Sequence, residues 1–553
     1  MSATRRPSRR AAIGWTAIGW AAVASSLAVL VVAPVGRLVT VATSGGWDGV
    51  RRAVATSGAS EAVGNTLWVS VVSTLVAVPL GIAMALIVDR GGPGHRAWLR
   101  AGLLLPLVVP RFVLGFSWLQ AYGESGLLDD AVGLRFPGLV GPAGIVAVTA
   151  VTMAPIAFLI VAAGLAVRAE PDLDKAARAS GASAWASLRT ITLPLVRPAA
   201  VAAAAVVFAA SVESFAIPAV LGIRAGFAMM TTRMYQQLTF SADPAAFTAA
   251  VVLALLMVAI VVLAVAPFDR ILSSRAVPLR ATPAGGSPSG SPRPVARAAT
   301  AGLWTYIVLV VLVPLAALTL SALTRAVGLP AVPENWSLEN FRQAFSGPSW
   351  SALGRSMALA LAAAAILAVL GGLLAGLERV SGWRRSGTLV TLSFALPGSA
   401  LAIGLLTAYG RWIGGTITII LLAYLAKLWA LSHRSIASSL ERLPADVLHA
   451  ARASGAHPLT AIRSVALPPL VPAVVAGFAL VFLFAFHEVT MSALLYGPGS
   501  RTLGVVVLNL QELGDVGRTS ALAVVMVAVA MASALAMLAA WRAGRRLIDG
   551  RRT

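Results

Sequence analysis

Long apolar runs, separated by short polar stretches, dominate this chain of 553 residues. A helix needs about 20 consecutive apolar residues to cross the hydrocarbon core of a bilayer. Runs of that length predict about twelve membrane-spanning helices in two sets of six. The first set is expected near residues 13–36, 63–88, 101–121, 142–167, 198–220 and 245–267, and the second near 303–324, 351–377, 388–409, 413–432, 471–495 and 518–541. The pattern predicts an all-α integral membrane protein.

The composition supports a membrane protein. Apolar residues make up 58% of the chain and charged residues 12%, whereas roughly a quarter of the residues in a soluble domain are charged. The chain has no cysteine, which excludes disulfides, iron–sulfur clusters and thiolate metal sites. No cluster of histidines and acids has metal-site spacing, so no metal or other cofactor is expected. The histidines at 95, 433, 449 and 457 are expected to be solvated, in or beside cytoplasmic loops.

Arginine sets the predicted orientation. A formal net charge of +22 can indicate nucleic-acid binding, but here the arginines lie mostly in alternate short loops, which is the pattern of membrane orientation. Both ends of the chain are rich in arginine, so both termini are expected in the cytoplasm. The first apolar run is longer than the core of a signal peptide and no clear cleavage site follows it. We therefore expect a retained helix.

A sequence repeat divides the chain into two halves. Residues 176–182 and 450–456 both read AARASGA, and Leu193-Pro194 matches Leu467-Pro468 at the same separation, which we call the repeat offset. Residues 268–302 are rich in Pro, Gly, Ser and Arg, which is typical of a linker. The predicted halves are residues 1–267 and 303–553. An even number of spans in each half makes the repeats parallel.

The repeated motif predicts a characteristic local structure. The first copy reads LDKAARASGASAWASLRTITLPLVRP from Leu173, and the second reads VLHAARASGAHPLTAIRSVALPPLVP from Val447. Alanine and arginine favour a helix, and the glycine then permits a turn. A second amphipathic stretch follows, and a proline opens the next span. We expect a short helix, a turn, a second short helix and re-entry into the membrane.

This motif resembles the EAA loop of type I ABC importer permeases, in which Glu-Ala-Ala, three residues, Gly and nine residues precede Ile-x-Leu-Pro. The matching positions are Ala176, Ala177, Gly181, Ile191, Leu193 and Pro194 in the first copy, and Ala450, Ala451, Gly455, Val465 (in place of Ile), Leu467 and Pro468 in the second. Lys175 and His449 replace the leading Glu, which leaves any salt bridge of that acid in doubt. The alternative is an amphipathic loop on the membrane surface.

The resemblance covers nearly the whole chain, with family cores expected near residues 61–267 and 349–541. It implies a non-enzymatic permease in the plasma membrane of a prokaryote. Its implied partners are the bilayer, two copies of an ABC ATPase that dock on the two loops, and an extracytoplasmic solute-binding protein. Neither lysine of the chain, Lys175 or Lys427, follows a glycine, so the chain has no P-loop and ATP hydrolysis is expected elsewhere. A proton-coupled secondary transporter, which would not need paired loops, is the alternative from another class.

The segments at 212–222 and 487–500 look like those of the iron(III) subgroup, with thiamine and polyamine importers as alternatives. Charged groups inside a membrane tend to face a cavity or one another, and carboxylates and imidazole suit Fe³⁺. The candidate path residues are Arg111, Glu213, His487 and Glu488. The alternative for these is a structural ion pair, such as Arg111 with Glu213, or a place near the external interface. Lys427 could extend to the cytoplasmic face.

Overall fold

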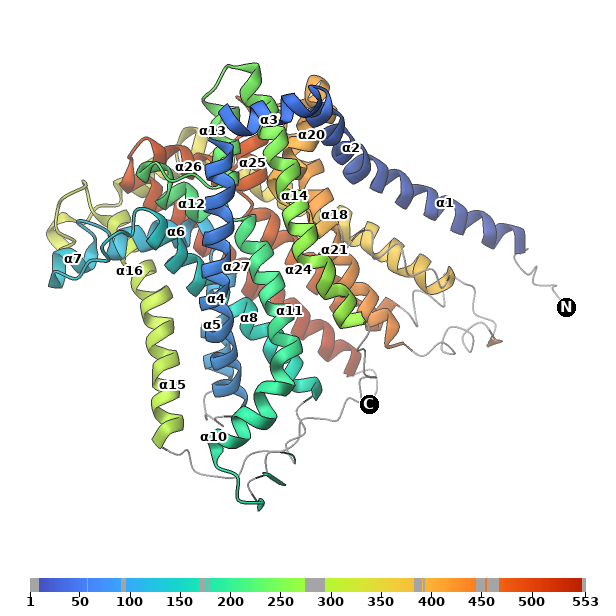
Figure 1. Ribbon diagram of the computed structural model, residues 1–553, viewed down its shortest axis with the longest axis horizontal. Coiled ribbons are helices and arrows are strands. Elements are labelled where there is room, and N and C mark those ends of the chain that lie inside the picture. The colour runs from blue at the N-terminus through green and yellow to red at the C-terminus, as the bar shows by residue number, and fades with distance from the viewer. Residues whose placement is uncertain are drawn as a thin grey trace.

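A computed structural model describes residues 9–549 except 57, 91–95, 169–172, 174–175, 178, 274–293, 382–389, 391–392, 444–452 and 455–466. The described chain is a bundle of long helices with a layer of shorter helices across one end (Figure 1). The β-pairing among these residues consists of two isolated bridges, Thr324 with Trp336 and Gly415 with Tyr496. The predicted all-α architecture is therefore confirmed.

Ten described helices are long and apolar enough to cross a membrane. Three of them are continued through a wider π-helical turn. Two of these are α1 (Arg9–Leu27), η1 (Ala28–Val32) and α2 (Ala33–Thr43), and α15 (Pro294–Ile307), η4 (Val308–Leu312) and α16 (Val313–Leu323); the third contains α11 (Leu193–Val212). The others are α4 (Ala59–Arg90), α8 (Pro142–Arg168), α14 (Pro244–Ser273), α18 (Gly347–Ser381), α21 (Ile417–Glu441), α24 (Leu467–Phe486) and α27 (Val516–Asp549).

The shorter helices lie between these spans. They are α3 (Gly46–Thr56), α5 (Arg96–Val108), α6 (Arg111–Tyr122), α7 (Leu127–Val132), α10 (Ala184–Ser187), η2 (Leu188–Thr192), α12 (Ala216–Leu221), η3 (Ile223–Ala225), α13 (Met230–Thr239), η5 (Pro333–Asn335), α17 (Glu339–Ala344), α20 (Gly398–Ile413), α25 (Thr490–Leu495) and α26 (Leu503–Glu512).

The third and ninth predicted spans are not straight helices. The third bends by 100° between α5 and α6, and it makes an eleventh span if the bent pair is counted as one. Of the ninth, the structure describes mainly the 16-residue α20. Pro110 and Pro397 precede α6 and α20 with nearly the same extended backbone, ψ 134° and 136°. Proline offers no N–H and disfavours a helical residue before it, so both helices begin afresh there.

The fifth and eleventh predicted spans extend beyond the C-terminal ends of the corresponding helices. Helix α11 ends at Val212 and α24 at Phe486, and each is followed by a short break and a separate short helix, α12 or α25. The prediction of one continuous helix over 198–220 and over 471–495 was therefore wrong. The breaks place Glu213, His487 and Glu488 between helices and not in the middle of a span.

The duplication is visible in the helix bounds. Helices α11 and α12 coincide with α24 and α25 when the chain is moved by the repeat offset, and α13 coincides with α26 when the offset is shortened by one position. Helix α14 ends at Ser273 and α15 begins at Pro294, so most of the predicted linker lies outside the described residues. The limits of the two halves stay a prediction.

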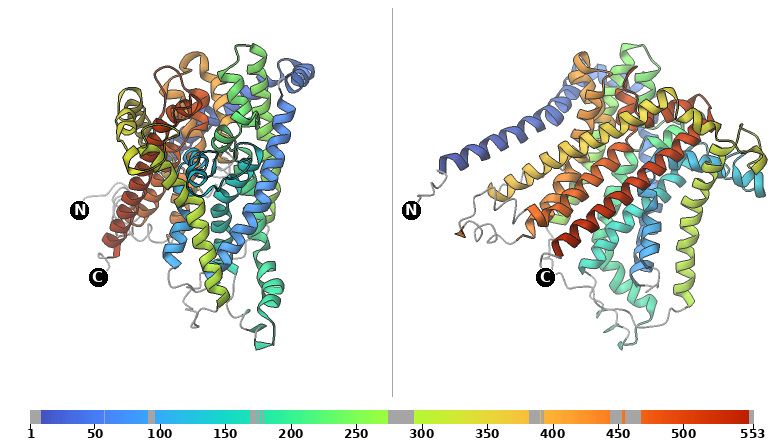
Figure 2. Two further views of the ribbon diagram at one scale, coloured as in Figure 1. Left: turned by 90° about the vertical axis from the view of Figure 1, so that its left-hand side faces the viewer. Right: turned by 180° about the vertical axis from the view of Figure 1, so that it is seen from behind.

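Helices of each half pack against helices of the other half. Helix α2 of the first half packs against α20 of the second, and α16 of the second half packs against α6 of the first. Helix α1 lies at the margin of the bundle beside α18 (Figure 2, right). One large apolar core contains buried residues of both halves, including Leu38, Phe112 and Trp429. The contact between the halves is therefore a packed interior where polar groups need partners.

Candidate functional site

An ion pair joins the two halves. Nζ of Lys427, in α21, lies 2.8 Å from Oε2 of Glu213, in the break after α11. The ammonium also donates to the carbonyl oxygens of Phe394 and Leu396, at 2.8 and 2.7 Å. An ammonium has three hydrogens to donate, and each has an acceptor here. The expectation that Lys427 extends to the cytoplasmic face was wrong, because these acceptors hold it between the halves with only 11% of its side chain exposed.

Arg111 is the first residue of α6, directly after the bend at Pro110. Among the described residues it has no carboxylate within 4.0 Å, so the suggested direct pair of Arg111 with Glu213 does not form. Glu213 is still near enough to interact electrostatically with Arg111. Two cations thus share the field of one carboxylate at the contact between the halves, leaving an excess of positive charge there.

His487 and Glu488 lie in the break after α24, and the repeat offset makes His487 the counterpart of Glu213. The carboxylate of Glu488 accepts hydrogen bonds from the N–H groups of Met491 and Ser492, at 2.8 and 3.0 Å. It therefore satisfies free donors at the start of α25. Nε2 of His487 is buried and has no hydrogen-bond partner in the described part of the chain.

A second buried pair was missed by sequence reasoning. Nε2 of His433, in α21, lies 2.8 Å from Oε2 of Glu378, in α18, and 6% and 11% of the two side chains are exposed. The expectation of a solvated His433 was wrong, because α21 continues past it to Glu441. The available signal was an acid and a histidine near the ends of two long apolar runs. The other three histidines of that prediction lie outside the described residues.

The first copy of the repeated loop folds around Gly181. The N–H of Ser180 donates to the carbonyl of Ala176 at 2.9 Å, and the N–H of Ala182 reaches back to Ala177 at 3.0 Å. Gly181 has φ +88°, a left-handed conformation that ends helices and favours glycine. Oγ of Ser183 then accepts the N–H of Ala186 at 3.1 Å and caps α10. These bonds form a helix end, a turn and a new helix.

The second stretch of the loop runs straight into the fifth span. Helix α10 continues through η2 into α11, and the N–H of Leu193 reaches five residues back to Leu188. This wider turn leaves room for the ring of Pro194, which would otherwise clash one turn earlier. Ile191 lies in η2, and Leu193 and Pro194 open α11. Loop and span are therefore joined without a break, and re-entry into the membrane at Pro194 stays a prediction.

The second copy is described at its end alone. Leu467 and Pro468 open α24, as Leu193 and Pro194 open α11. The remaining predicted positions, Ala450, Ala451, Gly455 and Val465, lie outside the described residues.

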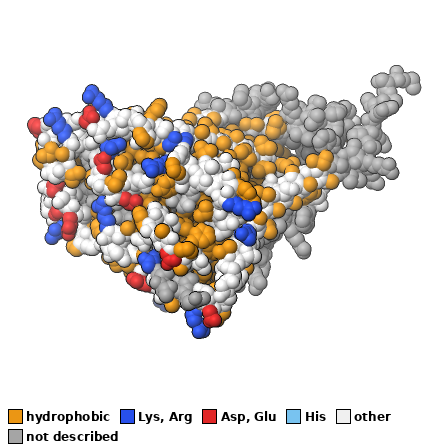
Figure 3. Space-filling model, turned by 90° about the horizontal axis from the view of Figure 1, so that it is seen from above, with side chains coloured by type: hydrophobic (Ala, Val, Ile, Leu, Met, Phe, Trp, Pro, Cys, Tyr) orange, Lys and Arg blue, Asp and Glu red, His pale blue; other side chains and the backbone are white. Residues whose placement is uncertain are grey.

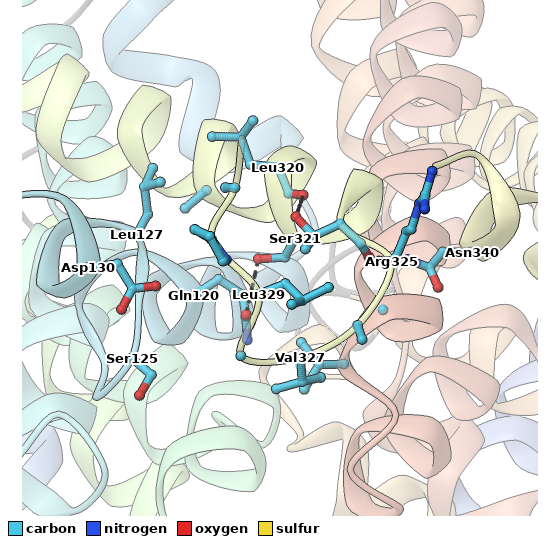
Figure 4. A pocket seen from close by; sticks show the side chains of 18 of the residues that line it. Gln120, Ser125, Leu127, Asp130, Leu320, Ser321, Arg325, Val327, Leu329 and Asn340 are labelled. Carbon is cyan, nitrogen blue, oxygen red and sulfur yellow. Dashed lines mark hydrogen bonds between the residues drawn. The ribbon is translucent and has the colours of Figure 1, made fainter. Parts of the chain in front are cut away.

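Two cavities open near the layer of short helices, on whose surface charged and hydrophobic side chains are interspersed (Figure 3). One, of about 500 Å³, lies between α6–α7 and the chain after α16; Ser321 bonds to Gln120 across it at 3.2 Å, and Asp130 and Arg325 are on its wall (Figure 4). The other, of about 600 Å³, is lined by α12 to α13 of the first half and by residues from Tyr496 to Leu513 of the second. The described residues contain no group of three or more His, Asp or Glu side chains that could hold a metal ion.

Both halves match one protein family. Residues 77–276 and residues 368–547 each match the binding-protein-dependent transport system inner membrane component, and together they cover more than half of the chain. The chain belongs to this family. It is a permease of the ABC importer class, built from two family units in one polypeptide.

Relatives of this permease are similar over half or all of its length. A probable ABC transporter permease protein, y4fN of Sinorhizobium fredii, is 23% identical over 95% of each chain. The ferric transport system permease protein FbpB of Actinobacillus pleuropneumoniae is 25% identical over 85% of this chain and 69% of its own. PhnV of Salmonella typhi, named for 2-aminoethylphosphonate transport, is 30% identical over 46% of this chain and 98% of its own.

Proposed function

We propose that this permease forms the translocation path of an ATP-driven, binding-protein-dependent importer, and that its loops at residues 173–194 and 447–468 each receive one subunit of a separate ATPase. The observation that carries the proposal is the continuous helix from α10 through η2 to Val212. A helix rises about 1.5 Å per residue, so α11 alone spans about 30 Å. A push on α10 is therefore carried along one helix from the loop to the break at Glu213.

The far end of that helix is where the halves meet. Glu213 follows the last residue of α11 and is paired with Lys427 of the other half. Closure of the ATPase would shift α11 and α24 and bias a rocking of one half against the other. The coupling positions in this proposal are those of the two EAA-like loops, from Ala176 to Pro194 and from Ala450 to Pro468.

The proposed orientation places both termini and both loops in the cytoplasm. Its support is the excess of arginine in the same alternate loops. Helix α10 and the C-terminal end of α27 also lie at the end of the bundle opposite to the short helices (Figure 1). The solute-binding protein would then dock on the layer of short helices, where both cavities open.

Two solutes are candidates. Ferric iron is favoured by the segments at 212–222 and 487–500, and by the match to a ferric permease over 85% of the chain. A phosphonate is favoured by the match to PhnV, and by the excess of positive charge that Lys427 and Arg111 leave around Glu213. An excess of positive charge attracts an anionic solute and repels a cationic one. The surroundings of Glu213 therefore suit an anionic group better than a bare trivalent cation.

The test is uptake by sealed vesicles that contain this permease with its co-encoded ATPase and binding protein. Labelled Fe³⁺ and labelled 2-aminoethylphosphonate are offered separately, with and without ATP on the side of the membrane that carries the ATPase. ATP-dependent accumulation of either solute supports the importer function and identifies the solute. Accumulation driven by a proton gradient in vesicles without the ATPase would contradict the proposal.

A further inference from the structure

The cavity between α13 and α26 is lined by equivalent helices of the two halves. Helices α13 and α26 correspond to each other through the repeat, and both contribute residues to the cavity wall. Thr239 and Glu512, the last residues of the two helices, occupy equivalent positions, and both are on that wall. A solute that enters between the halves from this end would meet this cavity, which we call the vestibule.

Two arginines, one from each half, make the vestibule a site for negative charge. Nη2 of Arg224 donates to the backbone carbonyl of Gln511 across the contact between the halves, at 2.8 Å. The guanidinium of Arg501 lies 6.0 Å from the ring centroid of Tyr496. In the described part of the chain neither arginine has a carboxylate within 4.0 Å. Guanidinium groups hold phosphonate, phosphate and carboxylate groups through paired hydrogen bonds.

The vestibule wall also carries a single acid. Glu512 is the one carboxylate among the described residues of the vestibule wall, and Oη of Tyr235, from the other half, donates to its Oε2 at 3.3 Å. An ionised carboxylate has two oxygens with about four acceptor sites, so Glu512 keeps acceptor capacity for a further donor. The vestibule thus offers two cations and one anion within about 600 Å³, a volume that fits a small solute.

We propose that the vestibule is the entry site of this permease for a small zwitterionic solute, whose oxyanion group is held by Arg224 and Arg501 and whose ammonium group is held by Glu512. The inference rests on the proposed importer function and selects an amino-phosphonate or a similar solute over ferric iron. Its charge balance of two cations to one acid recurs around Glu213, where Lys427 and Arg111 are the cations. A solute with a net negative oxyanion is attracted at both places.

The test measures binding to the full-length permease in lipid nanodiscs, without ATPase or ATP, by equilibrium dialysis of radiolabelled probes. The probes are 2-aminoethylphosphonate, ethylphosphonate (which lacks the amine) and Fe³⁺. We expect 2-aminoethylphosphonate to bind several-fold more tightly than ethylphosphonate. Arg224→Gln and Arg501→Gln should each weaken both phosphonates tenfold or more, whereas Glu512→Gln should remove the advantage of the amine and leave ethylphosphonate binding intact.

A matched control is Arg325→Gln, which removes an arginine from the wall of the other cavity and should leave binding unchanged. Because Arg224 also joins the halves, Arg224→Lys provides a second variant, which keeps the charge and should recover most of the affinity. Equal binding by the arginine variants and the unmodified permease would overturn the proposal. The proposal would also be overturned if Fe³⁺ bound in a way that depends on Tyr235 and Tyr496 and neither phosphonate bound. Because no ATPase is present, these outcomes are independent of whether the loops couple to one.

Discussion

Lys427 of the second half donates to the carboxylate of Glu213 of the first half over 2.8 Å. The duplication does not repeat this pair. When each residue is compared with its counterpart at the repeat offset, His487 takes the place of Glu213, and the uncharged Met153 takes the place of Lys427. The two halves therefore present different chemistry to each other at equivalent positions, although α11 and α24 have equivalent bounds there.

Removal of Lys427 should destabilise the permease more than removal of its acid partner. Lys427→Met leaves Glu213 unpaired and also strips the carbonyls of Phe394 and Leu396 of their donor, whereas Glu213→Gln keeps an acceptor for the ammonium. Breaking a buried pair costs about 3 kcal/mol or more, and the partial exposure of Glu213 reduces that figure. We expect a large fall in the unfolding temperature of the purified permease for Lys427→Met and a smaller one for Glu213→Gln.

The control for this comparison is Arg411→Met, which removes an exposed cation from α20 and should leave the unfolding temperature nearly unchanged. Equal effects of Lys427→Met and Glu213→Gln would show that the carbonyl contacts contribute nothing.

Gly181 should tolerate asparagine and reject valine. A Cβ atom at this position would meet no other atom within 4 Å, so the main cost of a substitution comes from the backbone at φ +88°. The left-handed conformation costs roughly 1–2 kcal/mol for most residues and less for asparagine. Gly181→Val should lose ATP-dependent uptake while the protein still inserts in the membrane, and Gly181→Asn should keep most of it. Full uptake by Gly181→Val would remove the turn from the coupling mechanism.

Glu488 should act as a helix cap and not as a ligand of the solute. Its carboxylate accepts from Met491, Ser492 and the hydroxyl of Ser492. Replacing a helix cap by alanine costs about 1 kcal/mol, so Glu488→Ala should lower the unfolding temperature. Glu488→Gln keeps one acceptor and should retain solute uptake. Loss of uptake in a Glu488→Gln variant of normal stability would return this residue to the translocation path.

Most of the membrane-spanning helices could be predicted from the sequence, because the bilayer itself requires long apolar runs. A spanning helix must be apolar along its length, so most spans could be predicted, and the repeated AARASGA gave the duplication. The breaks at Glu213 and at Pro110 were not predicted, because apolar composition continues through both of them. Hydropathy indicates which segments lie in the membrane, but it does not show where the backbone turns within such a segment.

The pairing of charges also lay beyond sequence reasoning. Glu213 and Lys427 are 214 residues apart, and their contact depends on how the two halves pack. Arg111 was an equally reasonable partner for Glu213 by composition. The structure decides between the two cations because the chain just before α20 supplies the backbone carbonyls that hold Lys427 beside the acid.

Trp185 should be a contact residue for the ATPase. It lies on α10 with 67% of its surface exposed, at the start of the helix that continues into the fifth span. Exposed tryptophans that become buried in an interface often dominate its binding energy. Trp185→Ala should weaken ATPase binding to the permease at least tenfold without lowering the unfolding temperature. The matched control is Trp98→Ala, equally exposed at 72% but on α5, and comparable losses in both variants would contradict the assignment.

Preference for the amine-bearing phosphonate should disappear on acidification. Burial raises the pKa of Glu512, and the hydrogen bond from Tyr235 opposes that rise only in part. The carboxylate therefore takes up a proton at a higher pH than an ordinary glutamate, and its attraction for ammonium is lost as the pH falls through that raised pKa. The ammonium group also favours ionisation of the phosphonate beside it, so the ratio of the dissociation constant of ethylphosphonate to that of 2-aminoethylphosphonate is compared between the unmodified permease and Glu512→Gln at each pH. The ratio in the unmodified permease should exceed that in Glu512→Gln at neutral pH and approach it at low pH; the same ratio in both proteins at every pH would separate the amine from Glu512.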